Sequence, residues 1–211
     1  MSPGGTRLLL TRHAQTVWHA ENRYAGRGSD IDLTEAGRTQ VQELAEWAKH
    51  QHLDAVVCSP IRRAVETAQP CAEAAELALR VVDDLREVDF GAAEGHTLDE
   101  LRRVDADMVR RFADDPAQHP FPGAEQPAAA AARCAAALRD AAGDHPGGRV
   151  LVVAHNTLLR LGLCALLDLP VGRYRQLFPR LDNATVTEIT VPRDRSDPAS
   201  LLTLNAGLSA P

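Results

Sequence analysis

The stretch Leu8-Leu9-Leu10-Thr11-Arg12-His13-Ala14-Gln15-Thr16 decides the fold of this chain. A short apolar run stops at a cation and an imidazole, and small polar residues follow. Such a run is typical of a buried parallel strand. In open α/β sheets the ligand crevice lies at the carboxyl ends of the strands. We therefore expect Arg12 and His13 to face a ligand site.

Strands and helices alternate along the rest of the chain. We expect further strands at 54–58, 80–82, 149–154, 183–191 and 201–204, and helices at 34–48, 61–76, 97–115, 128–142 and 157–167. The helix at 128–142 is expected to end at Gly143. This alternation predicts a three-layer α/β/α sandwich with a mostly parallel central sheet. We expect a single domain over residues 1–211, with a small helical lid inserted at about 97–126.

The composition argues against several classes of protein. The net charge is −6 at pH 7, so no overall field attracts nucleic acid or an anionic membrane, and we expect neither as a partner. The four cysteines lack the short spacings of zinc and redox motifs, which indicates free buried thiols in a reducing compartment. No secretory signal is visible, and the apolar helix at 158–169 is too short to span a bilayer. We expect a cytoplasmic protein.

The strand ends favour a site for a phosphoryl group. His13 and His155 each follow a buried strand, and the helix that begins near residue 61 carries Arg63. Guanidinium groups match phosphate oxygens, and an imidazole can attack phosphorus and hold it covalently. A carboxylic acid must then protonate the leaving oxygen and later activate water. Glu87, in a loop after the third strand, is the best placed carboxylate.

Each of these residues also has an ordinary interpretation. An Arg-His pair at a strand end is most often part of the surface, and a single loop carboxylate or half-buried histidine needs no catalytic role. The functional interpretation is favoured because several strand ends independently supply the same chemistry.

Several motifs also occur in the order and spacing of one family. They are Arg12-His13-Ala14-Gln15-Thr16, Leu33-Thr34-Glu35-Ala36-Gly37, Cys58-Ser59-Pro60-Ile61-Arg62-Arg63-Ala64, Leu85-Arg86-Glu87-Val88-Asp89-Phe90-Gly91, Val152-Val153-Ala154-His155 and Asn183-Ala184-Thr185-Val186-Thr187. Over about Leu8 to Val191 the chain resembles the histidine phosphatase superfamily, the phosphoglycerate-mutase-like proteins.

The resemblance implies a role for each matching residue. His13 would be the nucleophile that forms a phosphohistidine, and Glu87 the general acid and then the base. Arg12, Arg63 and His155 would bind the phosphoryl group and stabilise its charge. The resemblance implies no metal and no other cofactor.

Three positions depart from the family's pattern. Ala14 and Asn156 stand where glycine is usual, and His19 stands where an asparagine usually touches the phosphate. A histidine there can still donate a hydrogen bond, but it could make phosphate affinity depend on pH. We take Gln15, Thr16, His19 and Asn156 as further candidates for binding phosphate or substrate.

The sequence favours a phosphatase over a mutase, because the 97–115 segment balances its arginines with acids and offers no pocket for a bisphosphorylated effector. The expected substrate is a phosphomonoester of a small polar metabolite, of the sugar or polyol phosphate type. The alternatives are a phosphoglycerate-type phosphomutase and a non-catalytic protein that binds phosphorylated metabolites. We also hypothesise a homodimer formed through an exposed sheet edge at 185–191.

Overall fold

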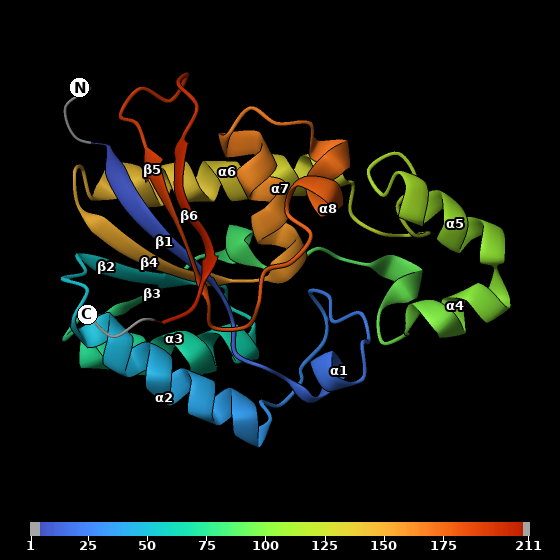
Figure 1. The fold of residues 1–211 in the computed structure, drawn as a ribbon, viewed down its shortest axis with the longest axis horizontal. Coiled ribbons are helices and arrows are strands. Elements are labelled where there is room, and N and C mark those ends of the chain that lie inside the picture. Colours follow the sequence, from blue (N-terminus) through green and yellow to red (C-terminus); the bar gives the residue numbers. More distant parts are fainter. Residues whose placement is uncertain (1–4, 209–211) are drawn as a thin grey trace.

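A six-stranded sheet forms the centre of the structure, a computed structural model that describes residues 5–208 (Figure 1). The strand order is β3-β2-β4-β1-β5-β6. The first four strands in this order are parallel, whereas β5 runs antiparallel to both β1 and β6. The strands are β1 (Thr6–Arg12), β2 (Ala55–Cys58), β3 (Leu79–Val81), β4 (Arg149–Ala154), β5 (Val186–Val191) and β6 (Ser200–Ala206).

Helices cover both faces of this sheet, which confirms the predicted three-layer sandwich (Figure 1). Alternate side chains of β1 divide between the two cores: Leu9 packs towards α2 (Glu35–Lys49) and α3 (Arg62–Ala74), whereas Leu8 and Leu10 pack towards α6 (Pro127–Asp144) and α7 (Asn156–Leu166). The shorter elements are α1 (Val17–Ala20), α4 (Leu98–Val104), α5 (Ala106–Asp114), α8 (Tyr174–Leu177) and the 3-10 turns η1 (Asp83–Leu85), η2 (Gly91–Ala93) and η3 (Val171–Arg173).

The 97–115 segment folds as two helices that project away from the sheet (Figure 1). Asp105 has an extended backbone that ends α4, and its side chain accepts a hydrogen bond from the Met108 N–H to begin α5.

The alanine-rich helix α6 does not end at Gly143 but continues through it to Asp144. The prediction that this helix ends at Gly143 is therefore wrong. The helix continues because Gly143 does not take the positive φ with which glycine ends many helices, whereas Gly147 does, with a φ of 81°.

The edge proposed for a homodimer is not free. β5 lies between β1 and β6, so its backbone groups are paired on both sides. The prediction of an exposed edge at 185–191 is wrong because β6 returns as a neighbouring antiparallel strand and is longer than the expected 201–204. The edge strands are β3 and β6.

Gly37 allows α2 to approach the loop that follows β1. A Cβ at this position would lie 2.2 Å from the carbonyl oxygen of Gln15. We therefore expect Gly37→Ala to lower the free energy of unfolding by about 1–3 kcal/mol, as overpacking does elsewhere. Urea denaturation measures the change. Gly143→Ala is the matched control: it lies in a helix with open space around it, and we expect it to be neutral or to stabilise by up to about 1 kcal/mol. Equal stability of the two variants would contradict the prediction.

Candidate active site

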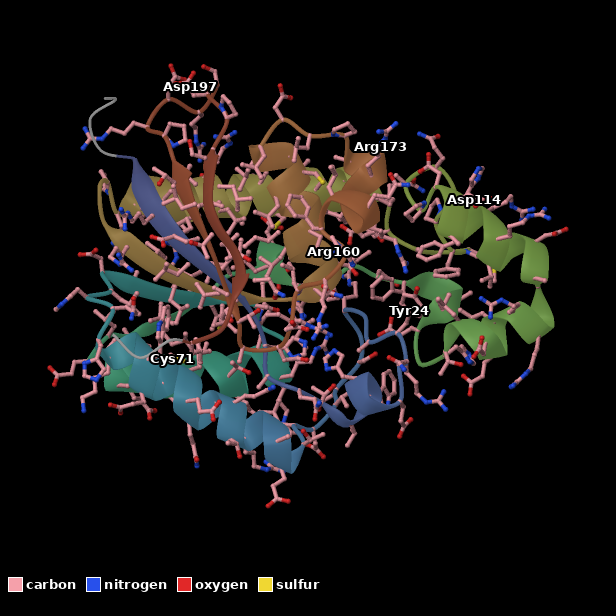
Figure 2. All side chains as sticks on the ribbon, in the orientation of Figure 1. Tyr24, Cys71, Asp114, Arg160, Arg173 and Asp197 are labelled. Atoms are coloured by element: carbon pink, nitrogen blue, oxygen red, sulfur yellow. The ribbon has the colours of Figure 1, made fainter. Side chains whose placement is uncertain are left out.

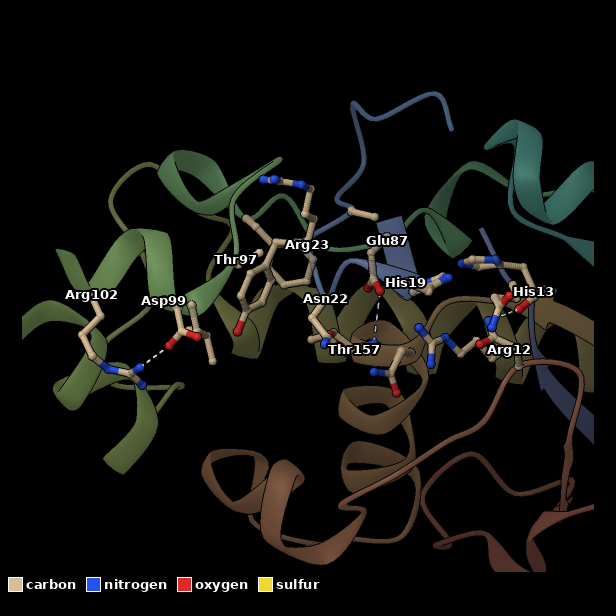
Figure 3. Close-up of a pocket in the computed structure, with 17 residues that line it drawn as sticks. Arg12, His13, His19, Asn22, Arg23, Glu87, Thr97, Asp99, Arg102 and Thr157 are labelled. Carbon is tan, nitrogen blue, oxygen red and sulfur yellow. Dashed lines mark hydrogen bonds and ion pairs between the residues drawn. The ribbon is translucent and has the colours of Figure 1, made fainter. Parts of the chain in front are cut away.

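A cavity of about 650 Å³ opens at the carboxyl ends of β1 and β4 (Figure 3). In Figure 3, Arg12, His13 and His19 lie at one end of this cavity, and Asp99 and Arg102 of α4 lie at the other. Of the residues expected to bind the phosphoryl group, Arg12 lines this end of the cavity, whereas Arg63 and His155 lie against His13 and are not part of the lining.

His13 is held in one tautomer. Its side chain is buried, and Nδ1 lies 2.8 Å from the carbonyl oxygen of Ala14, so Nδ1 must carry the hydrogen. Nε2 therefore has a lone pair, which accepts a hydrogen bond from Nε of Arg63 at 3.1 Å. Burial, and the neighbouring Arg63 charge, hold the pKa of His13 well below its ordinary value. The ring is a neutral imidazole with Nε2 as its nucleophilic atom.

Two arginines frame this imidazole. Arg63 is 1% exposed and donates to the carbonyl oxygens of Ser29, Ala25 and Gly26 as well as to His13. Arg12 donates to the carbonyl oxygen of Leu181 at 3.1 Å, while its buried Nε has no partner. Burial lowers the pKa of Arg12 to about 10, so both guanidinium groups stay charged at neutral pH. Arg62, the adjacent arginine, instead faces solvent and pairs with Asp32 and Glu66.

His155 is completely buried beside His13, with 5.1 Å between the two ring centroids. Its Nε2 lies 2.8 Å from Oγ of Ser59, which also accepts a hydrogen bond from the Ile61 N–H. The arrangement favours a hydroxyl hydrogen directed at Nε2 and a ring hydrogen on Nδ1. Nδ1 is buried and has no partner, so it can donate to an incoming phosphoryl oxygen.

Sequence reasoning gave Ser59 no role. The signal was present: Ser59 follows β2, and the register of β2 against β4 brings that strand end beside His155.

Glu87 lies in the loop after η1 and faces the same cavity beside the start of α7. Its oxygens accept hydrogen bonds from the N–H groups of Val88 and Leu158, each at 2.9 Å, and of Thr157 at 3.1 Å (Figure 3). The carboxyl is 5% exposed, and burial raises its pKa although these three N–H groups oppose the shift. A buried carboxyl with a raised pKa is suited to give a proton to a leaving group.

His19 lies against His13, with ring centroids 5.1 Å apart. Its Nδ1 accepts the Thr16 N–H at 3.2 Å, which leaves the ring hydrogen on Nε2. Burial, with the Arg12 and Arg63 charges, lowers the pKa of His19 to about 3. The ring is therefore neutral near pH 7 beside these two charges, and a dependence of phosphate affinity on pH through His19 stays a prediction.

Of the other candidates for binding phosphate or substrate, two line the cavity and one does not. Gln15 and Asn156 line the cavity, and Oδ1 of Asn156 is buried without a partner. Thr16 does not line it: this fully buried residue caps α1 behind His19. Asn183, which sequence reasoning passed over, lines the cavity and donates to the carbonyl oxygen of His13 at 2.7 Å.

The distal wall of the cavity contains arginines that are already paired. Arg23 binds both carboxylate oxygens of Glu100, at 2.8 and 3.1 Å, and Arg102 pairs with Asp99. The first of these pairs joins the loop after α1 to α4. Because each charge is compensated, this wall offers hydrogen bonds but little attraction for a second anion.

Three further observations concern the part of the chain that the structure describes. All four cysteines are free and buried, as predicted. Within residues 5–208, no three or more His, Cys, Asp or Glu side chains are arranged to hold a metal ion. No helix in the same range is long and apolar enough to cross a membrane.

Comparisons with known proteins identify the family of this chain. Residues 8–203 match the histidine phosphatase superfamily (branch 1). Phosphoserine phosphatase 1 of Hydrogenobacter thermophilus is 31% identical over 90% of this chain and 89% of its own. A probable phosphoglycerate mutase of Salmonella choleraesuis is 30% identical over 86% of this chain and 83% of its own. The solved structure of a mycobacterial glucosyl-3-phosphoglycerate phosphatase in complex with VO3 has a TM-score of 0.86 and 30% identity, and the match covers 95% of this chain and 99% of the other. The chain belongs to the histidine phosphatase superfamily and is a phosphatase of that class.

Proposed function

We propose that the protein is a metal-independent phosphomonoesterase that hydrolyses a small phosphorylated metabolite through a phosphohistidine at His13. One observation carries the proposal. The lone pair of His13 Nε2 faces the Arg63 guanidinium, and Arg12 and His155 lie beside it with nitrogens that have no partner. A phosphoryl group placed there would meet a nucleophile and three groups able to donate hydrogen bonds to its oxygens.

In the first step, Nε2 of His13 attacks phosphorus and the bond to the ester oxygen breaks. Glu87, whose pKa is raised by burial, gives its proton to the departing oxygen, so that an alcohol leaves. The Ala14 carbonyl oxygen accepts a hydrogen bond from Nδ1–H of His13 and so stabilises the positive charge that the ring acquires. Arg12, Arg63 and His155 stabilise the negative charge on the transferring group.

In the second step, water attacks the phosphorus of phosphohistidine. The Glu87 carboxylate accepts a proton from this water, and the bond to Nε2 breaks. Inorganic phosphate is formed, His13 returns as a neutral imidazole and Glu87 is again protonated. One residue thus serves as acid and then as base.

The cavity supports a small substrate. Its volume of about 650 Å³ leaves space beyond the phosphoryl site for a leaving group the size of a small metabolite. Relatives are named for phosphoserine and for glucosyl-3-phosphoglycerate, both small phosphorylated molecules. We propose that α4 and α5 act as the lid over this leaving group, with the Arg23–Glu100 pair holding α4 against the loop after α1.

Phosphate release from a panel of small phosphomonoesters, measured with EDTA present, tests the proposal. We expect release that persists in EDTA, with small polar esters preferred over phosphopeptides. Conversion of phosphoglycerate in the presence of a bisphosphate primer, without net phosphate release, would instead identify a mutase. Binding of the esters with neither activity would identify a non-catalytic protein.

Ser59 is expected to set the tautomer of His155. In Ser59→Ala, His155 Nε2 loses its partner, and the ring can place its hydrogen away from the phosphoryl group. We expect kcat/KM to fall about tenfold, the effect of about 1.4 kcal/mol, in the range for one buried hydrogen bond. Steady-state kinetics with a single ester measures the change. Unaltered kcat/KM in a folded Ser59→Ala protein would contradict this role.

A further inference from the structure

A partly buried ion pair lies beside the backbone of the loop that carries Glu87. Nε and Nη2 of Arg133 in α6 bind the two carboxylate oxygens of Glu125, at 2.7 and 2.8 Å. The two side chains are 20% and 18% exposed, whereas every other ion pair within residues 5–208 has a side chain that is more than a quarter exposed. Bidentate geometry and partial burial both strengthen an ion pair. We call Arg133 and Glu125 the Arg133 clamp.

The other donors of Arg133 reach the backbone of the loop. Its Nη1 and Nη2 donate to three carbonyl oxygens, those of Asp84 at 2.6 Å, Arg86 at 2.8 Å and Glu87 at 3.4 Å. Together with the two bonds to Glu125, these hydrogen bonds use all five N–H groups of the guanidinium. Beyond Glu87, the Glu125 N–H donates to the carbonyl oxygen of Asp89 at 2.9 Å. The clamp therefore holds the main chain on both sides of Glu87.

This support does not depend on the protonation of Glu87. Residues 86–90 form neither a helix nor a strand. The Glu87 carboxyl is held by three N–H groups, those of Val88, Thr157 and Leu158. In the proposed mechanism this carboxyl gives up a proton and regains one, and a protonated carboxyl accepts hydrogen bonds less strongly than a carboxylate does. The bonds from Arg133 go to backbone carbonyl oxygens, which keep their strength as acceptors in both steps.

We propose that Arg133, together with Glu125, is a positioning residue for the acid. It fixes the main chain of residues 84–89, so that the Glu87 carboxyl stays in reach of the ester oxygen in the first step and of water in the second. The proposal rests on the proposed function, because it assigns a support to the acid of that mechanism. A general acid must lie within hydrogen-bond distance of the atom that it protonates, and a displacement of about 1 Å lowers rates by up to about 10²-fold. Arg133 itself does not line the cavity, so it acts through Glu87.

Esters with poor and good leaving groups test this role. Arg133→Gln should lower kcat/KM for the best alkyl ester of the panel by about 10- to 100-fold, mostly in kcat, because a departing alkoxide needs a proton. The same variant should lower kcat/KM for p-nitrophenyl phosphate by less than about threefold, since nitrophenolate leaves without a proton. A structural defect unrelated to the acid would reduce both rates equally, and that result would overturn the positioning role.

Two further variants distinguish geometry from charge. Arg133→Lys keeps the positive charge but not the planar fork, so it should recover little of the loss. Full recovery by lysine would overturn the clamp. In Glu87→Gln protein, Arg133→Gln should add less than about threefold to the loss for the alkyl ester, because the acid that it positions is already gone. Losses that multiply in the double variant would show that Arg133 acts by another route.

Arg139→Gln is the matched control. Arg139 lies on the same helix α6, and its Nη1 donates to the carbonyl oxygen of Asp197 at 3.4 Å. Figure 2 shows Asp197 far from Tyr24, which lines the cavity. This variant should keep the wild-type kcat/KM for both esters. A leaving-group effect in Arg139→Gln like that in Arg133→Gln would contradict a specific role for the clamp.

Hydrogen exchange tests the clamp without catalysis. The amides of residues 84–90 should exchange about tenfold faster in Arg133→Gln than in wild type, and at the wild-type rate in Arg139→Gln. If the wild type releases phosphate from no ester, the proposed function fails, whereas faster exchange in Arg133→Gln still supports the clamp. Unchanged exchange overturns it. If Arg133→Gln does not fold, Glu125→Gln replaces it, and we expect the same leaving-group pattern with a smaller loss.

Discussion

Replacing His13 with alanine is expected to lower phosphate release by about 10⁴-fold or more, the scale of loss when a covalent nucleophile is removed. No other imidazole can take its place, because His155 is fully buried with Nε2 against Ser59, and Nδ1 of His19 accepts from Thr16. The ring removed is small and does not carry the strand, so the fold should persist. Phosphate release under single-turnover and steady-state conditions measures the loss, and circular dichroism checks the fold.

His50→Ala is the control for His13→Ala, since His50 is an exposed histidine paired with Glu46. It should retain wild-type activity. Wild-type protein quenched during turnover should carry acid-labile phosphate on a peptide that contains residue 13. Full activity of folded His13→Ala protein would sink the phosphohistidine mechanism.

Replacing Glu87 with glutamine is expected to reduce kcat/KM by about 10²- to 10⁴-fold, the range for loss of a general acid. Glutamine keeps the size of the side chain but cannot give a proton to the departing oxygen. The loss should shrink for an ester such as p-nitrophenyl phosphate, whose leaving group needs little protonation. An equal loss for good and poor leaving groups would argue that Glu87 only supports α7.

The pH profile distinguishes a general-acid role of Glu87 from a purely structural role in supporting α7. Burial raises its pKa, so the carboxyl is protonated below that raised pKa and ionised above it. The first step requires the proton, and kcat/KM of the wild type should therefore fall as pH rises through this pKa. Glu87→Gln should lose that alkaline limb. His19 should contribute no limb near neutral pH, because its pKa is about 3 in the unliganded protein.

Much of the site could be predicted because strand ends converge. His13 and His155 are far apart in sequence, but β1 and β4 are parallel neighbours, in a register that pairs Arg12 with Ala154. Apolar runs that end in functional residues are visible in sequence, and a parallel sheet brings such ends to one edge. Sequence reasoning chose Arg63 rather than Arg62 for the phosphoryl site. The structure accounts for it through the rotation between successive residues of α3, which buries Arg63 and exposes Arg62.

The rest depended on tertiary contacts that leave little trace in the sequence. No local feature of the sequence indicates that β6 pairs with β5. The sequence therefore predicted an exposed edge at a strand that is paired on both sides. Arg133 looks like an ordinary polar residue of an alanine-rich helix, and its bonds to the loop that carries Glu87 emerge only when α6 packs against that loop. Thr16 shows that a residue of a signature motif can have a structural place, since it stands at the N-cap of α1 and does not line the cavity.

The hydrogen bond between Arg63 and His13 has a consequence for reactivity. The lone pair that would attack phosphorus is the one that accepts the Arg63 N–H at 3.1 Å. An uncharged electrophile would therefore meet an occupied nitrogen, whereas an anion that draws the guanidinium towards its own oxygens would free that nitrogen on arrival. The Arg63 hydrogen bond thus covers the nucleophilic nitrogen of His13, and a phosphate ester would uncover it by attracting the guanidinium. Resistance to alkylating reagents and readiness for phosphate esters would then be one property of a single contact.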